Sequence, residues 1–213
     1  MGTPTTLDIP TPRGPARARV SRPEGATLAL IMGHGAGGGV DAPDLAAVAA
    51  AAAGAGLATA LVEQPYRVAG RRAPEAARHL DTAWQAVWEH LAAGPLGGMA
   101  LVAGGRSSGA RVACRTAAAT GAVGVACLAF PVRPPARAGA APKPDRLDEL
   151  DAVAVPLLVV QGERDPFGTV PDAPGRTVLS LPGDHSLRRS AGDAGAGVVS
   201  WARALTAPAA AAP

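Results

Sequence analysis

The chain contains few aromatic side chains and almost no lysine. Aromatic residues make up 3% of its 213 residues, and Lys143 is the only lysine, so the other basic side chains are arginines. With so few rings available, we expect a core built mainly from alanine, valine and leucine. The shortage of lysine beside an excess of alanine is more typical of a GC-rich coding bias than of selection for a binding partner.

The chain also lacks a dense run of basic residues interleaved with aromatic ones. Its formal net charge is +3 and its isoelectric point is about 9.5, which permits contact with nucleic acid without favouring it. A nucleic-acid surface combines stacking rings with cations that bind phosphates. We therefore expect no nucleic-acid partner.

Cysteine is scarce as well. The two cysteines, Cys114 and Cys127, fall within expected helix or strand segments and not in loops. This pattern predicts small buried apolar side chains in a reducing compartment, with neither a disulfide framework nor a metal site.

No segment has the composition of a signal peptide or a membrane span. Residues 1–20 are rich in proline, threonine and arginine and contain no apolar core. No stretch reaches about eighteen apolar residues free of glycine and charge. We therefore predict a cytoplasmic protein that has no membrane partner.

The length and composition predict a single globular domain. The chain is 48% hydrophobic and 17% charged, and a chain of this size buries roughly 70% of its unfolded surface. We expect one domain over residues 1–206, with residues 1–15 extended or flexible and residues 207–213 forming a disordered tail of alanine and proline.

Short apolar segments alternate with longer segments of helical periodicity, which predicts a doubly wound, mostly parallel α/β sheet with helices on both faces. The expected strands are Ala16–Ser21, Thr27–Met32, Leu57–Glu63, Gly98–Ala103, Ala122–Phe130, Pro156–Gln161 and Thr177–Leu181. Helices are expected over Asp41–Ala53, Pro74–Ala93 and Val198–Leu205, from the end of the segment Gly105–Gly109 to about Thr120, and over the short segment Asp145–Leu150.

A serine stands between two glycines just after one of these strands. The segment Gly105–Gly109 has the pattern G-x-S-x-G and leads from an apolar run into a helical segment. This arrangement is typical of a nucleophile elbow, in which small residues allow a strained strand-to-helix turn and expose the hydroxyl. The pattern predicts Ser107 as a nucleophile. Ser108 does not fit, because the flanking glycines are then out of register.

An acidic residue and a histidine follow two later strands. Asp165 comes soon after Pro156–Gln161, and His185 comes after Thr177–Leu181. Because the carboxyl ends of parallel strands meet at one edge of a sheet, both side chains should reach Ser107. We predict His185 as general base and Asp165 as the acid that orients it.

Two other carboxylates lie close to these positions in the sequence. Asp172 is the alternative to Asp165, because it lies a few residues further along the same loop. Asp184 is adjacent to His185, and neighbouring side chains rarely face each other correctly, so we expect it only to cap the turn.

A glycine-rich loop, residues 33–39, directly follows the strand Thr27–Met32. Acyl transfer places negative charge on a carbonyl oxygen, and fixed backbone N–H groups stabilise that charge. We predict an oxyanion hole made by the amides of Ser108 and Ala36, with Gly35 or Gly37 as alternatives to Ala36. His34 is expected to shape this loop.

Several residues near this edge are candidates for substrate contact. They are His34, Gly35, Tyr66, Arg67 and Arg106. Tyr66 and Arg67 end a strand on the catalytic edge. Each of them either contacts the substrate or lies in a solvated loop. Arg106 precedes the nucleophile, where it either pairs with a carboxylate at the edge of the sheet or meets an anionic substrate. The sequence leaves these alternatives open.

On these motifs the chain resembles the α/β-hydrolase superfamily, and within it the small, lid-poor branch that includes dienelactone hydrolases. The resemblance covers roughly Leu28 to Arg203. It implies an eight-stranded type of sheet, trimmed at the N-terminus, and hydrolysis of carboxylic esters or related acyl bonds. There is no room for a large cap insertion, because only the loop Pro131–Val155 is available. The short segment between Asp165 and His185 implies a lost helix.

Two other functions remain as alternatives. A protein of hydrolase fold can serve as a non-catalytic binding or scaffold module. Gly33, Gly35 and Gly38 with Glu63 also fit a dinucleotide-binding oxidoreductase, although the next helix should then begin among the glycines. We favour the serine hydrolase, acting on a small-molecule acyl substrate with no cofactor and no metal. The sequence gives no oligomeric state.

Overall fold

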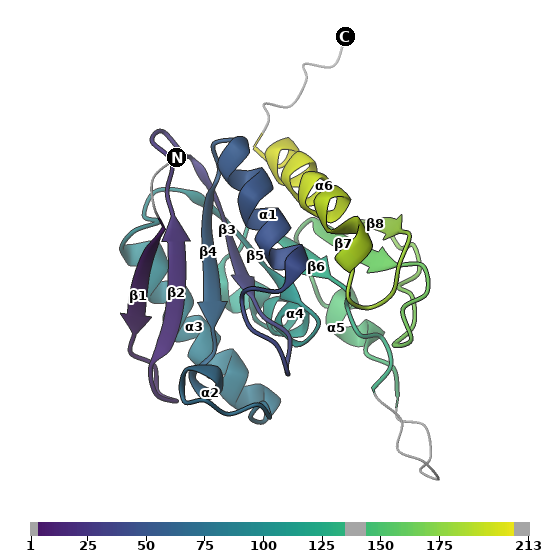
Figure 1. Cartoon of the computed structure of the whole chain (residues 1–213), viewed down its shortest axis with the longest axis horizontal. Coiled ribbons are helices and arrows are strands. Elements are labelled where there is room, and N and C mark those ends of the chain that lie inside the picture. Colours follow the sequence, from purple (N-terminus) through teal and green to yellow (C-terminus); the bar gives the residue numbers. More distant parts are fainter. Residues whose placement is uncertain (1–3, 135–143, 207–213) are drawn as a thin grey trace.

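The computed structural model describes residues 4–134 and 144–206, and these form one eight-stranded sheet (Figure 1). The spatial order is β1-β2-β4-β3-β5-β6-β7-β8. Strand β2 runs antiparallel to both β1 and β4, and all other neighbouring pairs are parallel. The strands are β1 (Thr5–Ile9), β2 (Ala16–Ser21), β3 (Leu28–Gly33), β4 (Ala58–Glu63), β5 (Ala100–Arg106), β6 (Gly124–Leu128), β7 (Leu157–Gly162) and β8 (Arg176–Leu181).

Helices cover both faces of this sheet. Helices α1 (Pro43–Gly54) and α6 (Ala191–Ala204) lie side by side on one face, and α3 (Ala77–Ala93), α4 (Ser108–Thr120) and α5 (Leu147–Asp151) lie on the other (Figure 1). A short helix, α2 (Pro65–Val68), follows β4, and a 3₁₀ turn, Arg188–Ser190, precedes α6. Each face has its own hydrophobic cluster. The predicted doubly wound fold is confirmed.

The central strands are buried along their whole length. Every residue of β3, β6 and β7 is buried, as expected for parallel strands covered on both faces. Their continuous apolar sequences made them easy to predict, and the observed bounds differ from the predicted ones by only a few residues.

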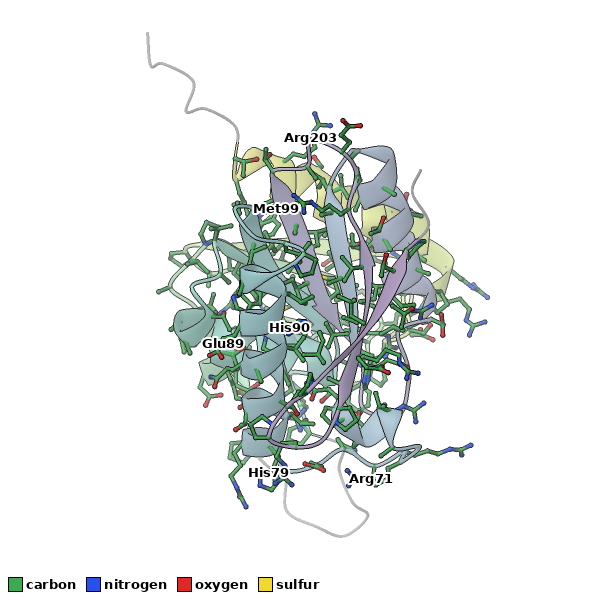
Figure 2. All side chains as sticks on the ribbon, turned by 90° about the vertical axis from the view of Figure 1, so that its left-hand side faces the viewer. Arg71, His79, Glu89, His90, Met99 and Arg203 are labelled. Atoms are coloured by element: carbon green, nitrogen blue, oxygen red, sulfur yellow. The ribbon has the colours of Figure 1, made fainter. Side chains whose placement is uncertain are left out.

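Helix α3 buries one face and exposes the other. Trp84 and Trp88, one turn apart, are buried and pack against each other with ring centroids 6.5 Å apart, so their predicted role in core packing is confirmed. His79 and His90 come from the same helix and are labelled in Figure 2. His90 is exposed, and Nδ1 of His79 lies 3.5 Å from a carboxylate oxygen of Glu75.

The sheet is not trimmed at the N-terminus, so that expectation was wrong. Residues Thr5–Ile9 form β1, which pairs antiparallel with β2. This edge strand was missed because its residues are mostly exposed and polar, so that it carries little hydrophobic signal.

Helix α6 begins seven residues before its predicted start, at Ala191 and not at Val198. Glycines obscured the helical pattern, but one of them serves the packing. A Cβ atom at Gly195 would lie 2.6 Å from the carbonyl oxygen of Ala47. Glycine at this position therefore lets α6 approach the backbone of α1.

The connection between β7 and β8 contains no helix, as expected. The side chain of Gln161 organises it instead. Its Oε1 accepts from the amide of Val170 at 2.6 Å, while its Nε2 donates to the Val170 carbonyl at 3.3 Å and to Oγ of Ser180 at 3.2 Å. One amide side chain thus makes the hydrogen bonds that a neighbouring strand would make.

Between β6 and β7 the described residues hold only the short helix α5 and no cap domain. Part of the loop Pro131–Val155, namely residues 135–143, lies outside the described residues, as do residues 1–3 and the expected tail 207–213. Within residues 4–134 and 144–206, no helix has both the length and the apolar sequence needed to cross a membrane.

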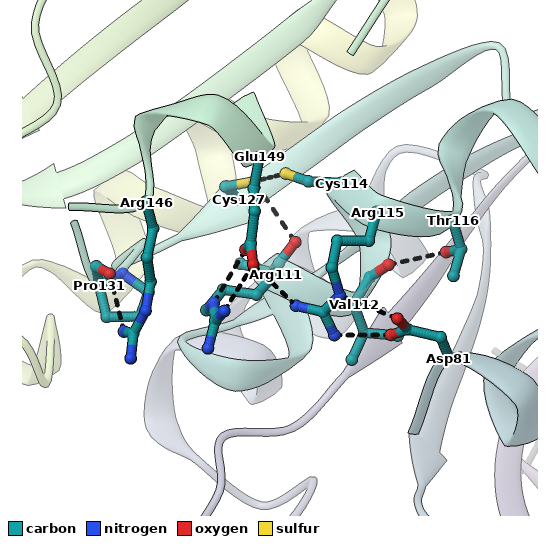
Figure 3. Close-up of polar contacts among 11 residues, drawn as sticks. Asp81, Arg111, Val112, Cys114, Arg115, Thr116, Cys127, Pro131, Arg146 and Glu149 are labelled. Atoms are coloured by element: carbon teal, nitrogen blue, oxygen red, sulfur yellow. Dashed lines mark hydrogen bonds and ion pairs between the residues drawn. The ribbon is translucent and has the colours of Figure 1, made fainter. Parts of the chain in front are cut away.

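Ion pairs join α3, α4 and α5 (Figure 3). Arg111 binds Glu149 with two hydrogen bonds, and Arg115 binds Asp81 with two more while contacting Glu149 at 3.2 Å. We call Asp81, Arg111, Arg115 and Glu149 the helix network.

The two cysteines lie near this network, between α4 and β6. Cys114 and Cys127 are buried, and their sulfur atoms are 3.4 Å apart without a covalent bond. Their prediction as small buried side chains is confirmed.

Candidate active site

Ser107 occupies the sharp turn between β5 and α4. Its backbone has φ 52° and ψ −108°, a left-handed conformation that is strained for a residue with a side chain. Ser108, the next residue, is the first of α4, so its N–H lies at the positive end of the helix dipole.

Glycines on both sides of the turn allow the backbones to touch. A Cβ atom at Gly105 would lie 2.6 Å from the carbonyl oxygen of Gly33, and one at Gly109 would collide with the same oxygen. The turn therefore rests directly on the end of β3. We call Gly33 and residues 105–109 the elbow region.

Three side chains from separate loops form a continuous hydrogen-bonded chain. His185 Nε2 lies 3.0 Å from Ser107 Oγ, and His185 Nδ1 lies 2.7 Å from Asp165 Oδ2. A carboxylate can only accept, so Nδ1 carries the proton and Nε2 is free to accept from the serine hydroxyl. The structure brings together the three residues that the sequence pattern singled out.

Backbone contacts fix the loops that carry the acid and the histidine. The amide of Arg164 donates to the Gly183 carbonyl at 2.9 Å, and at Gly162 a Cβ atom would collide with the Asp184 carbonyl oxygen. The other oxygen of Asp165, Oδ1, accepts from the amide of Phe167 at 2.8 Å. The two loops therefore form one unit at the ends of β7 and β8.

The ring of Phe167 limits the movement of the histidine. It packs edge to face against the His185 ring, with centroids 4.5 Å apart. The side chain of Asp165 is only 1% exposed and that of His185 is 16% exposed. The acid is thus shielded from water, while the imidazole reaches the surface beside Ser107.

The two neighbouring carboxylates take no part in this arrangement. Asp172 is exposed, and the two ring nitrogens of His185 bind Asp165 and Ser107 instead. Asp184 accepts from both the amide and the hydroxyl of Ser186, at 2.9 and 2.6 Å, and these bonds lower the pKa of Asp184. Its expected role as a turn cap is confirmed.

His34 stabilises the glycine-rich loop from within. The amide of Gln64 donates to His34 Nε2 at 3.1 Å, so Nδ1 carries the proton and donates to the Gly35 carbonyl at 2.8 Å. Burial lowers the pKa of His34, which keeps the ring neutral in this tautomer. His34 therefore shapes the loop and is not exposed to a substrate.

Tyr66 lies beneath the same loop. Its hydroxyl donates to the Ala36 carbonyl at 2.8 Å, and its side chain is buried, which raises the pKa of Tyr66 to about 12. Arg67 is half-buried, and its Nη1 donates to the Arg71 carbonyl at 3.2 Å. Tyr66 thus holds the glycine-rich loop through its hydroxyl and is itself buried, so it does not lie in a solvated loop.

The glycine-rich loop lies against the nucleophile. A Cβ atom at Gly35 would lie 3.6 Å from Cβ of Ser107. The amide of Ala36, the next residue, donates to no acceptor among the described residues. The amides of Ala36 and Ser108 therefore remain the predicted oxyanion donors.

Arg106 pairs with a carboxylate, one of its two predicted partners. Its Nε lies 3.0 Å from Oδ2 of Asp44, and its Nη2 donates to the backbone carbonyl of His185 at 3.0 Å. Sequence reasoning did not single out Asp44, although its position after Pro43, in the first turn of an expected helix, was visible.

The geometry does not fit dinucleotide binding. Helix α1 begins at Pro43, after the glycine-rich loop has ended, so no helix N-terminus lies among the glycines. Glu63 Oε1 lies 3.6 Å from the position of a Cβ atom at Gly39, where it faces the loop backbone. The glycines of this loop instead lie next to Ser107.

Comparisons with known proteins agree with this fold. A family model described as an alpha/beta hydrolase domain matches residues 26–194. No curated protein sequence matches the chain.

Solved structures with a similar backbone cover nearly the whole chain. An alpha/beta serine hydrolase without a lid from Xanthomonas campestris is 22% identical, with a TM-score of 0.72 over 98% of each chain. The dienelactone hydrolase of Anabaena variabilis is 19% identical, with a TM-score of 0.71 over 94% of this chain and 97% of its own. An alpha/beta serine hydrolase homologue from Coxiella burnetii is 17% identical, with a TM-score of 0.71 over 96% of this chain and 97% of its own. At these identities the likeness shows the fold alone.

Proposed function

The chain belongs to the alpha/beta hydrolase family, and from this premise we propose that it is a serine hydrolase that cleaves carboxylic esters or related acyl bonds. The observation that carries this proposal is the continuous chain from Ser107 Oγ through the His185 ring to Asp165, with contacts of 3.0 and 2.7 Å.

The order of proton transfers follows from the tautomer of His185. As Ser107 Oγ attacks the acyl carbonyl carbon, its proton passes to Nε2, which is the free acceptor. The imidazolium that forms keeps its Nδ1–H bond to the buried Asp165 carboxylate, which stabilises the positive charge. Nε2 then gives the proton to the leaving alcohol. As water attacks the acyl-enzyme, Nε2 accepts a proton from the water and returns it to Ser107 Oγ when the acyl group leaves as the acid.

The carbonyl oxygen becomes negatively charged during each attack. The Ser108 amide, at the N-terminus of α4, and the Ala36 amide, in the loop beside Ser107, would donate to it. Loss of one such donor typically costs about 10²–10³ in turnover. The hydrogen bonds of His34 and Tyr66 to the loop, at 2.8 Å each, support its shape in this role.

The expected substrate is a small or short-chain acyl compound in an open site. The described residues hold no cap domain over Ser107, and the chain offers few aromatic side chains to enclose a large acyl group. The similar structures include a dienelactone hydrolase and a hydrolase without a lid, which favours esters and lactones for a first substrate panel. The two free buried thiols are compatible with the reducing cytoplasm.

Labelling with a fluorophosphonate probe, which phosphonylates activated serines, tests the proposal directly. Wild-type protein should be labelled, and Ser107→Ala should not be. Ser108→Ala is the matched control, because it removes a neighbouring hydroxyl and keeps the backbone amide, so labelling should persist. The same three proteins are then compared on short-chain esters.

A well-folded wild-type protein that neither reacts with the probe nor cleaves any ester would contradict the proposal. That outcome would favour the non-catalytic binding or scaffold module. Labelling that survives in Ser107→Ala would instead show that the reactive serine lies elsewhere.

A further inference from the structure

Arg106 contacts three parts of the active site at once. Its Nε is paired with the Asp44 carboxylate at 3.0 Å, and its Nη2 donates to the His185 carbonyl at 3.0 Å. Its Nη1 lies under the glycine-rich loop, 2.9 Å from where a Cβ atom of Gly35 would be. One guanidinium thus joins the first turn of α1, the loop that carries His185 and the glycine-rich loop.

Asp44 holds this guanidinium in place from below. Its side chain is fully buried, and its Oδ1 accepts from the amide of Leu45 at 2.9 Å. Burial raises the pKa of Asp44 while the charge of Arg106 lowers it. The pair is in close ionic contact without an aligned hydrogen bond at Oδ2. Asp44 therefore fixes the position of the arginine.

The contact with His185 is made through the backbone. The guanidinium binds the carbonyl of the residue whose ring contacts Ser107, so loss of Arg106 would remove a hydrogen bond that holds the backbone of His185. A phenylalanine ring and Asp165 hold the ring itself. Among the described residues, Arg106 is the side chain that anchors the carbonyl of His185.

We propose that Arg106, anchored by Asp44, is a positioning residue that aligns His185 with Ser107. This inference rests on the proposed hydrolase function and extends it to a pair of residues outside the triad. Arginine suits the position because its planar fork serves two acceptors in different directions, whereas a lysine ammonium is a single point charge. A misplacement of 1 Å can cost about 10²-fold in rate.

The central test is Arg106→Gln, with steady-state kinetics on a neutral ester. We expect kcat to fall about 10- to 100-fold while KM changes by less than about threefold, because the side chain aligns catalytic groups and does not touch the substrate. The second-order rate of fluorophosphonate labelling should fall by a similar factor. In a crystal structure of the variant, the distance from Ser107 Oγ to His185 Nε2 should exceed its value of 3.0 Å.

Arg115→Gln is the matched control. The Arg115 side chain is 19% exposed, as is that of Arg106, and it too pairs with carboxylates. It lies in the helix network and contacts neither catalytic loop. We expect its kcat to remain within about twofold of wild type.

Two conservative variants keep the test valid if Arg106→Gln does not fold. Asp44→Asn retains the shape of the anchor without its charge, and Arg106→Lys retains the charge without the fork. Each should lower kcat about 3- to 10-fold, less than Arg106→Gln, with KM nearly unchanged.

Three results would overturn the inference. The first is a kcat within twofold of wild type in all three variants. The second is a KM that rises about tenfold for anionic esters alone with kcat retained, which would make Arg106 a substrate contact. The third is an equal loss of kcat in Arg115→Gln. A wild-type protein that is inert to the probe would contradict the hydrolase function itself, and the Oγ–Nε2 distance in the variants would still report on the alignment.

Discussion

The elbow region leads into the N-terminus of α4, the helix network binds α4 through Arg111 and Arg115, and the two stabilise the helix in different ways. In the elbow region, Gly105 and Gly109 lie against the backbone of Gly33 so closely that neither position has space for a side chain. In the helix network, long charged side chains bridge gaps between helices. Gly105 and Gly109 tolerate no added atom, whereas the helix network depends on side-chain atoms that reach far from the backbone.

Two arginines of equal exposure make the difference concrete. Arg106, next to the elbow, uses one end of its guanidinium on a catalytic loop, whereas all the side-chain hydrogen bonds of Arg115 go to carboxylates of neighbouring helices. Burial and charge are alike in the two cases. What each arginine does is therefore determined by the atom it contacts.

The largest effect on stability is expected for Gly109→Ala. Its methyl group would collide with the carbonyl oxygen of Gly33, and backbone cannot move aside as a side chain can. We expect the free energy of unfolding to fall by about 3 kcal/mol or more, measured by urea denaturation.

Gly192→Ala in α6 is the control for this prediction. A Cβ atom there meets nothing within 4 Å, and the position is the second of the helix, so the free energy of unfolding should change by less than about 1 kcal/mol. If both substitutions had the same effect, the contrast between crowded and open positions would be invalid.

Glu149→Gln should have an intermediate effect on stability and none on catalysis. It removes the charge that binds Arg111 and Arg115, and we expect a loss of about 1–3 kcal/mol. The kcat for esters should stay within about twofold of wild type. A fall in kcat comparable with that of Arg106→Gln would erase the distinction between the two regions.

Tyr66→Phe should slightly weaken the support of the glycine-rich loop, whose Ala36 amide is a predicted oxyanion donor. The lost hydrogen bond to the Ala36 carbonyl is worth about 1 kcal/mol net, and we expect kcat to fall about 3- to 10-fold. Unchanged kcat would show that the loop keeps its shape without this bond.

The same variant should change how stability depends on alkaline pH. The folded pKa of Tyr66 is raised to about 12, above its ordinary value of 10.0, so the unfolded chain ionises first as the pH rises. The stabilising contribution is fully present below pH 10.0 and is lost between that pH and about 12. Denaturation across this range should show a steeper loss for wild type than for Tyr66→Phe.

The smallest effect is expected for Arg17→Gln. Arg17 pairs with Asp8 across β1 and β2, and both side chains are exposed, so water and salt screen the attraction. The melting temperature should not change measurably, and adding salt should not distinguish the variant from wild type. A clear loss would mean that this edge pair contributes as much as the buried ones.

The sequence was sufficient for the central strands and for the residues at their ends. Continuous apolar runs located β3, β6 and β7, and the positions of Ser107, Asp165 and His185 followed from where such strands end. These signals are local in the chain. Their meeting at one edge follows from the parallel arrangement of the strands.

Other features depend on contacts between distant segments and could not be predicted. Asp44 and Arg106 are 62 positions apart, and nothing in either segment identifies the other as its partner. The amphipathic signal of β1 was too weak, and the glycines of α6 hid a helix whose packing on α1 requires them. In each case the missing information was the neighbour across space.

The side-chain amide of Gln161 affects the stability of the loop between β7 and β8, which carries Asp165. Because one nitrogen of that side chain faces the Val170 carbonyl, exchanging the nitrogen for oxygen, as in Gln161→Glu, would set two lone pairs against each other where an attraction now exists. Replacing that single heavy atom would weaken the hold of Gln161 on Val170, and with it the loop between β7 and β8 that carries Asp165.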